Sequence, residues 1–183
     1  NFILVLFFIL VTAVFTGCGA KASTTMAAEE EGIMLPVPQK DSDFSLEETL
    51  QGRRSVRSFS AEALTLEHVG QLCWAAQGIT SSSGGRTAPS AGGLYPLKVY
   101  LAAGNVDGLA AGVYRYEPLS HSLSKIMDGD MRDELTGAAL DQAWVRQAAM
   151  DIVITGDYDV TGVKYGGRAE RYTHLEAGHA AQN

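Results

Sequence analysis

The pattern of hydrophobic and polar residues predicts a domain that begins with two helices. Ser45 and Glu48 form a capping-box pattern, so a short helix should begin there and end near Gly52. Thr65 can cap a second helix, because apolar residues recur behind it at the spacing of one helical face. That apolar stripe consists of Leu66, Val69, Leu72, Cys73 and Ala76.

The middle of the chain has the pattern of strands. Residues 98–103 form a strand-like run. Residues 113–116 and 123–126 alternate between apolar and polar positions around a segment with Pro118, which predicts a hairpin. Residues 151–156 are a short apolar run of the kind found in buried strands.

Two further helices complete the pattern. Residues 131–140 are one candidate, and another helix begins at about Arg168. One face of the latter carries Tyr172, Leu175, Glu176 and His179. Because hairpin strands are mixed among the helices, the sequence predicts an α+β fold rather than a doubly wound sheet.

The N-terminal residues 2–15 are almost wholly apolar, but they are fewer than the roughly 20 residues that a spanning helix needs. They fit the core of a secretory signal peptide. Cys18 follows a small residue and so resembles the lipidation site of bacterial lipoproteins, although Phe15 stands where such sites usually have Leu. The resemblance implies a signal peptide over 1–17, a lipid on Cys18 and a membrane-anchored protein of the bacterial envelope. An ordinary signal peptide with a chance cysteine is the alternative.

Domain boundaries follow from composition. Residues 18–39 are rich in Ala, Ser, Thr and Glu without a hydrophobic period, which predicts a flexible tether behind the lipid anchor. Residues 40–183 suffice for one folded domain. The chain lacks an initial Met and ends within a helical pattern, so we expect a fragment that lacks both ends, including the C-terminal part of the domain.

Charge and cysteine content exclude several classes of function. A net charge of −7 argues against nucleic acid as a partner. Besides Cys18 the chain has only Cys73, so a disulfide within one mature chain is not expected, and Cys73 is interpreted as a small core residue. The four histidines show no metal-binding spacing, so no metal site is predicted.

Two segments have the residue types of a ligand site. Residues 85–97 form a loop rich in Gly, Ala and Ser, which allows backbone to approach a flat ligand closely, or which simply gives a flexible entry to a strand. Arg53, Arg54 and Arg57 surround Ser55, and such groups bind phosphate or offset the negative end of the preceding helix. Together the two segments favour a phosphorylated, planar cofactor.

These segments carry a resemblance to a known family. Residues 53–59 resemble the Arg-(Arg/His)-Ser-x-(Arg/Lys) motif that opens the nitroreductase superfamily of FMN-dependent oxidoreductases. More narrowly, the chain looks like the SagB-type, thiazole/oxazole-forming dehydrogenase branch. The other segments that carry the resemblance are residues 72–80, 86–97, 112–116, 164–166 and 175–183. It extends from about Leu35 to the last residue and implies a mixed, mainly antiparallel sheet flanked by helices.

The resemblance also implies roles for individual residues. The FMN phosphate and ribityl chain would be held by Arg53, Arg54 and Ser55. Arg57 would lie near the pyrimidine edge of the flavin, where a cation stabilises the negative charge of the reduced ring. One side of the isoalloxazine would be lined by Pro89, Ser90, Ala91 and Gly92. Members of the family are homodimers with FMN at the subunit interface, so a homodimer is expected here.

Lys164 and Tyr165 match the Lys-Tyr pair implicated in azoline oxidation by the SagB-type branch. Such oxidation removes a proton from carbon while hydride leaves to flavin N5, and either side chain could act as the base. Without the resemblance, a solvated Lys and a core-facing Tyr in a Gly-rich loop would be the simpler interpretation. Glu176 and His179 are expected to pack and hydrogen-bond within the dimer-forming helix.

Several functions remain open at this point. The leading one is FMN-dependent oxidation or reduction of a small molecule or peptide, by a stand-alone member that exchanges electrons with an envelope partner. A general nitro or quinone reductase is an alternative within the same class. A lipid-anchored flavin-binding protein without turnover is the alternative from another class.

Overall fold

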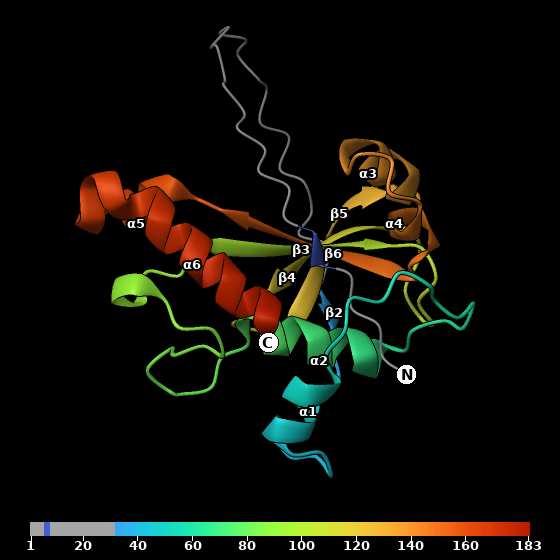
Figure 1. The fold of residues 1–183 in the computed structure, drawn as a ribbon, viewed down its shortest axis with the longest axis horizontal. Coiled ribbons are helices and arrows are strands. Elements are labelled where there is room, and N and C mark those ends of the chain that lie inside the picture. The colour runs from blue at the N-terminus through green and yellow to red at the C-terminus, as the bar shows by residue number, and fades with distance from the viewer. Residues whose placement is uncertain (1–5, 8–31) are drawn as a thin grey trace, which may run out of the picture.

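The computed structural model describes Leu6–Phe7 and residues 32–183, which form one layered domain (Figure 1). Most of the expected signal peptide, and Cys18 with it, lie outside the described residues. Of the apolar N-terminal run, the backbone of Leu6–Phe7 is described as strand β1.

A six-stranded sheet forms the centre of the domain, in the order β1-β6-β3-β4-β5-β2. Its other strands are β2 (Ile33–Met34), β3 (Leu97–Ala103), β4 (Gly112–Glu117), β5 (Ser122–Asp128) and β6 (Met150–Gly156). Strand β1 runs parallel to β6, and the other neighbouring strands that the structure describes are antiparallel. The sheet is therefore mixed and mainly antiparallel, as expected.

Strand β3 lies at the middle of the sheet because it is apolar over most of its length. Leu97, Val99 and Leu101 are buried, and β3 pairs with β6 over all seven of its residues and, along its other edge, with β4 over Tyr100–Ala103. The predicted hairpin is confirmed: β4 and β5 pair around a turn in which His121 adopts φ +48°. Tyr114, on the inner side of β4, is 1% exposed and anchors the hairpin in the core.

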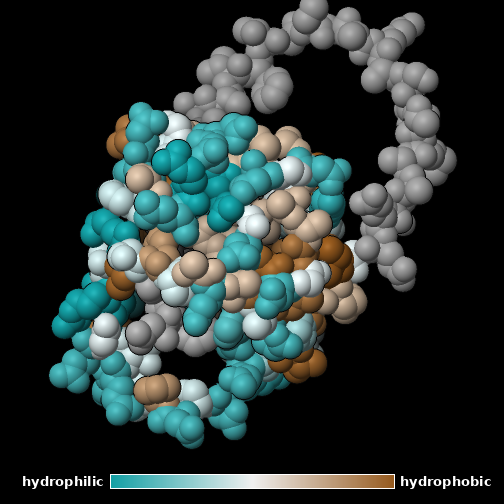
Figure 2. All heavy atoms as spheres, turned by 90° about the vertical axis from the view of Figure 1, so that its right-hand side faces the viewer, coloured by the Kyte–Doolittle hydropathy of each residue, from teal (hydrophilic) through white to brown (hydrophobic). Residues whose placement is uncertain are grey.

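Six helices surround the sheet in the described part of the chain. They are α1 (Leu46–Gly52), α2 (Leu66–Gln77), α3 (Arg132–Ala138), α4 (Ala143–Gln147), α5 (Tyr158–Tyr165) and α6 (Ala169–Gln182). Helices α2 and α6 contact each other and strand β3, so they cover the same face (Figure 1). Figure 2 looks onto the end that carries α3 and α4, where hydrophilic side chains cover most of the surface and hydrophobic ones gather in one patch.

Both predicted helix caps are present. Ser45 forms a complete capping box with Glu48, and α1 ends at Gly52. Thr65 caps α2, with His68 in the return position of the box. The helices begin where they do because these side chains satisfy backbone N–H groups that have no partner in the first turn.

The stripe predicted on α2 forms part of the core. Val69 and Cys73 are fully buried, and Ala76 is nearly so. Burial raises the pKa of the Cys73 thiol far above its usual value, so the residue behaves as a hydrophobic group. This confirms the interpretation of Cys73 as a core residue.

The structure differs from the sequence expectations at several element boundaries. The chain joins the sheet before residue 40: Ile33–Met34 pairs with β5, and Leu35 is buried. The helix expected over 131–140 ends at Ala138, because Leu140 and Asp141 turn the chain with positive φ. These boundaries depend on partners distant in sequence or on turn conformations that apolar periodicity does not report.

Helix α5 was not predicted. Without the family resemblance, the simpler interpretation places Lys164 and Tyr165 in a Gly-rich loop, whereas both close this helix. The sequence signals for this helix are weak, because it contains Gly162 and because its buried residue is the polar Thr161. Asp157, which accepts a hydrogen bond from Asp159 N at 3.0 Å, is the cap that could have revealed it.

Candidate functional site

Residues 89–93, here called the small-residue loop, connect the region behind α2 to strand β3. They end in the 3-10 turn η1 (Ala91–Gly93), with Gly92 at φ +66° and Gly93 at φ +67°. Ser90 holds the loop together: its carbonyl accepts a bond from Gly93 N at 3.1 Å, and its hydroxyl accepts one from Tyr95 N at 2.9 Å. The loop carries only small side chains, so a flat ligand can approach its backbone.

Helix α5 brings Lys164 and Tyr165 against this loop. A Cβ atom on Gly92 would lie 2.9 Å from Lys164 Nζ and 2.8 Å from the Tyr165 hydroxyl. Lys164 is exposed and Tyr165 is half-buried, with the ammonium 5.6 Å from the ring centroid. The pair expected to do chemistry therefore contacts the loop expected to face the flavin.

A buried carboxylate supports the loop from α6. Glu176 is 2% exposed and accepts a hydrogen bond from the Ser90 hydroxyl, while its Oε1 has no partner among the described residues. Burial raises the pKa of Glu176, and both Ser90 and the positive charge of Arg86 oppose that rise. His179 is exposed on the same helix, so the two residues play separate roles.

Arg86 and Gln77 extend this buried polar group toward α2. The Arg86 guanidinium donates to Gln77 Oε1 at 2.9 Å and lies 4.5 Å from the ring centroid of Tyr95. A pocket of about 240 Å³ opens beside them, between the start of β3 and the end of β4. Sequence reasoning gave no role to Arg86 or Gln77. The position of Gln77 four residues after Cys73, on the buried stripe of α2, is the signal that could have found it.

The arginine cluster, Arg53, Arg54 and Arg57 with Ser55, lies on an extended segment after α1. All four residues are exposed, and none of the arginines has a carboxylate partner in the described part of the chain. Arg54 donates to the backbone carbonyls of Gln51 and Arg53, both at 2.8 Å. The Arg57 guanidinium lies 5.2 Å from the ring centroid of Trp144 in α4. These cations are available to bind an anion.

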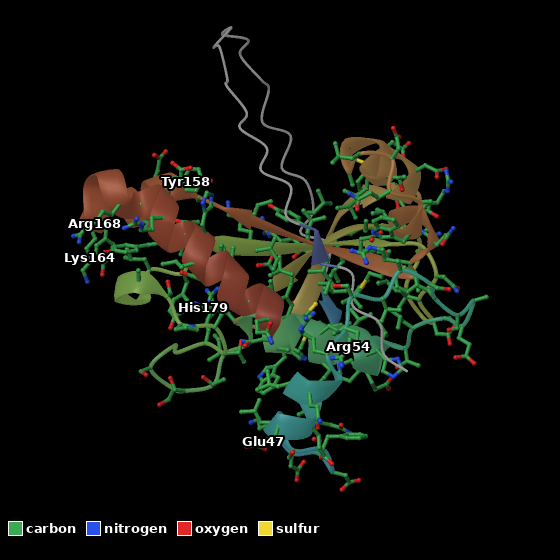
Figure 3. The ribbon with its side chains drawn as sticks, in the orientation of Figure 1. Glu47, Arg54, Tyr158, Lys164, Arg168 and His179 are labelled. Atoms are coloured by element: carbon green, nitrogen blue, oxygen red, sulfur yellow. The ribbon has the colours of Figure 1, made fainter. Side chains whose placement is uncertain are left out.

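The arginine cluster and the small-residue loop lie far apart within one chain. Figure 3 shows Arg54 beside α2, whereas Lys164, which contacts Gly92, lies well away from it at the α5 end of the domain. The sequence predicts that both segments bind one cofactor. A single chain does not bring them together.

Known proteins share both the sequence and the fold. The nitroreductase family model matches residues 50–183, which is most of the chain. The chain belongs to the nitroreductase family. It is 41% identical over 141 residues to a protein of Methanocaldococcus jannaschii named "putative nitroreductase", covering 77% of this chain and 71% of the relative.

Solved nitroreductase structures agree with this fold. A crystal structure titled "putative nitroreductase" from Ralstonia eutropha superposes with a TM-score of 0.71 and 33% identity, covering 86% of this chain and 70% of that one. An E. coli microcin synthetase complex with truncated pro-MccB17 bound is similar in fold alone, with a TM-score of 0.53 and 23% identity over 84% of this chain and 62% of that one. The α+β architecture is that of a nitroreductase, and the chain is an oxidoreductase of this family.

Two features are absent from the residues that the structure describes. No helix there is long and apolar enough to cross a bilayer. No group of three or more His, Cys, Asp or Glu residues there is arranged to hold a metal ion.

Proposed function

We propose that this nitroreductase binds FMN and works as a homodimer, with each flavin held between two copies of the chain. One copy supplies the arginine cluster and the other supplies the small-residue loop with Lys164 and Tyr165. The observation that carries the proposal is the separation of the two half-sites: both are exposed and have complementary chemistry, but they lie far apart in one chain (Figure 3). A two-fold dimer pairs such half-sites twice, in a symmetric manner.

The residues present fit the parts of FMN. Arg53, Arg54 and Ser55 offer guanidinium and hydroxyl donors for a phosphate, without competing carboxylates in the described part of the chain. Arg57, held against Trp144, offers a positive charge for the pyrimidine edge. Gly92 leaves its backbone uncovered, and a Cβ atom there would displace the ends of the Lys164 and Tyr165 side chains.

Bound FMN supplies the ability to accept or donate hydride at N5. Residues of this chain supply orientation and proton transfer. The Lys164 amino group and the Tyr165 phenol oxygen stand over Gly92, where the deprotonated form of either could take a proton from a substrate carbon and the protonated form could return one. A mere flavin carrier does not need two proton-transferring groups at this position, so their placement favours an enzyme.

Among flavin-dependent oxidations and reductions, we propose SagB-type dehydrogenation of a small molecule or peptide. The Lys164–Tyr165 pair is the feature that supports this choice. General reduction of nitro compounds or quinones uses the same flavin but does not need a base at the substrate carbon. Replacement of Tyr165 by Phe should therefore slow a dehydrogenation much more than a quinone reduction. Comparison of the two rates in Tyr165→Phe distinguishes the two activities.

The experiment that tests the dimeric flavin site is complementation between two defective variants. Arg57→Ala damages one half-site and Gly92→Ala the other, so each homodimer should lose the visible absorption of bound flavin. In a coexpressed mixture, each heterodimer regains one intact site, and about a quarter of the wild-type flavin should return. Flavin in the wild type without recovery in the mixture would place the site within one chain. A colourless wild type that ignores added FMN would reject the cofactor.

The N-terminal segment supports a second proposal, on location. We propose that residues 1–17 direct export and that Cys18 is lipidated, so the enzyme is held at the bacterial envelope. Cys18→Ser should move the protein from the membrane fraction to the soluble fraction after cell lysis. An unchanged distribution between the fractions would contradict the anchor.

A further inference from the structure

The corner between α5 and α6 gathers two cations and two aromatic rings beside the small-residue loop. The rings of Tyr165 and Tyr172 meet edge to face, with centroids 4.9 Å apart and an interplanar angle of 89°. The Arg168 guanidinium lies 5.9 Å from the first ring centroid and 5.5 Å from the second, and Lys164 Nζ lies 5.6 Å from the Tyr165 centroid. These four side chains are called the cationic corner below.

The two cations of this corner have no carboxylate partner among the described residues. Four ion pairs occur in the described part of the chain, and neither Lys164 nor Arg168 belongs to any of them. Both residues are exposed, on a chain with a net charge of −7. Within a mainly acidic protein, two adjacent uncompensated cations produce a local positive potential that attracts anions.

The cationic corner lies beside the proposed flavin site. Lys164 and Tyr165 contact Gly92 of the small-residue loop, and Arg168 is the last residue of the turn that follows them, residues 166–168. Figure 3 shows Lys164 and Arg168 next to each other at that end of the domain. A molecule that reacts over the loop would therefore lie against the corner.

We propose that the cationic corner binds the carboxylate of an organic acid that combines a flat ring system with an oxidisable C–H bond, and that such acids are the substrate class of this enzyme. The inference rests on the proposed flavin site. A guanidinium that stacks on an aromatic ring keeps the N–H groups at its edge available, and this edge matches the two oxygens of a carboxylate. The tyrosine rings provide an apolar surface for the planar part of the same molecule. Arg168 is the anchor, and Lys164 adds attraction while it serves the reaction.

The test compares 4-nitrobenzoate with 4-nitrobenzamide, which have nearly the same shape and differ in charge. Each is titrated into the oxidised, FMN-loaded protein without a reductant. Its Kd is read from the change in the visible flavin spectrum, or by equilibrium dialysis. We expect the benzoate to bind about tenfold more tightly than the benzamide at low salt, and the preference to shrink at high salt.

Arg168→Gln should reduce this preference to near unity, and Arg168→Lys should retain part of it. Arg171→Gln is the matched control, because Arg171 is an exposed arginine of the same helix, and the recorded ring contacts of this corner involve Arg168 instead. The control should keep the wild-type preference. Flavin content and circular dichroism show whether each variant is folded.

Three outcomes would overturn the inference. Equal Kd values for the two compounds in flavin-loaded wild-type protein would reject the acid as substrate and leave the proposed function intact. If Arg168→Gln no longer bound FMN but still bound riboflavin, the corner would be shown to hold the cofactor phosphate instead. A wild type that binds no flavin would reject the proposed function and this inference together.

Discussion

Gly92 is the residue at which the small-residue loop meets the Lys164–Tyr165 pair. It shares a positive φ with Gly93, but their surroundings differ: a Cβ on Gly92 would reach Lys164 and Tyr165, whereas one on Gly93 would meet nothing within 4 Å. The two glycines therefore separate the effect of backbone strain from the effect of contact with the pair.

Gly92→Ala and Gly93→Ala should each lower the free energy of unfolding by about 1 kcal/mol, because an L-residue at this φ is strained. The two alanine variants should differ in activity, since only the one at Gly92 displaces the Lys and Tyr side chains. Because the same displacement disturbs the proposed flavin site, we expect kcat per protein chain to fall at least about tenfold in Gly92→Ala relative to Gly93→Ala. Denaturant unfolding and steady-state kinetics measure the two effects. Equal kcat values in the two variants would show that the contact is not used in catalysis.

Asp151 is a buried carboxylate outside the candidate site. It is 3% exposed, and neither of its oxygens has a hydrogen-bond partner among the described residues. Burial raises its pKa to about 7, while nearby Arg132 lowers it and Asp130 raises it. Because the folded state holds this proton more tightly than the unfolded chain, whose carboxyl has a pKa of 3.8, stability falls as pH rises from about 4 to about 7.

Asp151→Asn should remove this pH dependence. We expect the variant to match the wild type near pH 4 and to exceed its free energy of unfolding by about 1–3 kcal/mol at pH 8. Asp141→Asn is the control, because it removes an exposed carboxylate from a turn with positive φ that Asn tolerates. Urea unfolding across pH measures both. Parallel profiles for the wild type and Asp151→Asn would contradict the assignment.

Helices α1 and α2 both begin with a capping box, but only α2 packs into the core. Helix α1 contains no buried residue, whereas α2 places Val69 and Cys73 fully in the core. A cap stabilises the whole domain only if its helix is coupled to the core.

Thr65→Ala should lower the global free energy of unfolding by about 1 kcal/mol, the usual effect of losing a cap. Ser45→Ala should change the global value by less than about half as much and mainly allow α1 to fray. Denaturant unfolding gives the global values, and hydrogen exchange of the first turn reports local opening. An equal global loss in the two variants would show that α1 is coupled to the core.

For the whole molecule, the exposed apolar residues before the arginine cluster indicate where a second copy packs. Phe44, Leu46 and Leu50 are all more than half exposed on or beside α1, although they are large and hydrophobic. Such residues on one short segment are typical of a surface that is covered in an assembly. Since the arginine cluster follows this helix, the surface lies next to one half of the proposed flavin site.

Leu46→Gln combined with Leu50→Gln should weaken the dimer and thereby release flavin at low protein concentration. We expect the dimer dissociation constant to rise at least about tenfold, because two apolar side chains lose their burial between copies. Leu119→Gln is the control, since Leu119 is equally apolar and is exposed on the hairpin turn, remote in sequence from α1. Analytical ultracentrifugation and flavin absorbance are the measurements. Unchanged dimerisation in the double variant would place the interface elsewhere.

The features that sequence analysis predicts correctly depend on local interactions. The capping residues Ser45 and Thr65, the hairpin around Pro118 and the apolar stripe with Cys73 each depend on neighbours within a few positions, so their pattern predicts the α+β fold correctly. The motifs with Arg53 and Gly92 likewise identify the family before any contact is known.

Other features are set by tertiary packing, because they depend on residues that are distant in the sequence. Helix α5 carries only a weak pattern, and its packing against α6 places Lys164 and Tyr165 on Gly92. The burial of Glu176 beneath Ser90, and the pairing of residues 33–34 with β5, follow from the same long-range packing. Chain folding likewise separates the arginine cluster from the small-residue loop. Local propensity cannot report these facts, because the free energy that determines them comes from contacts between segments far apart in the chain.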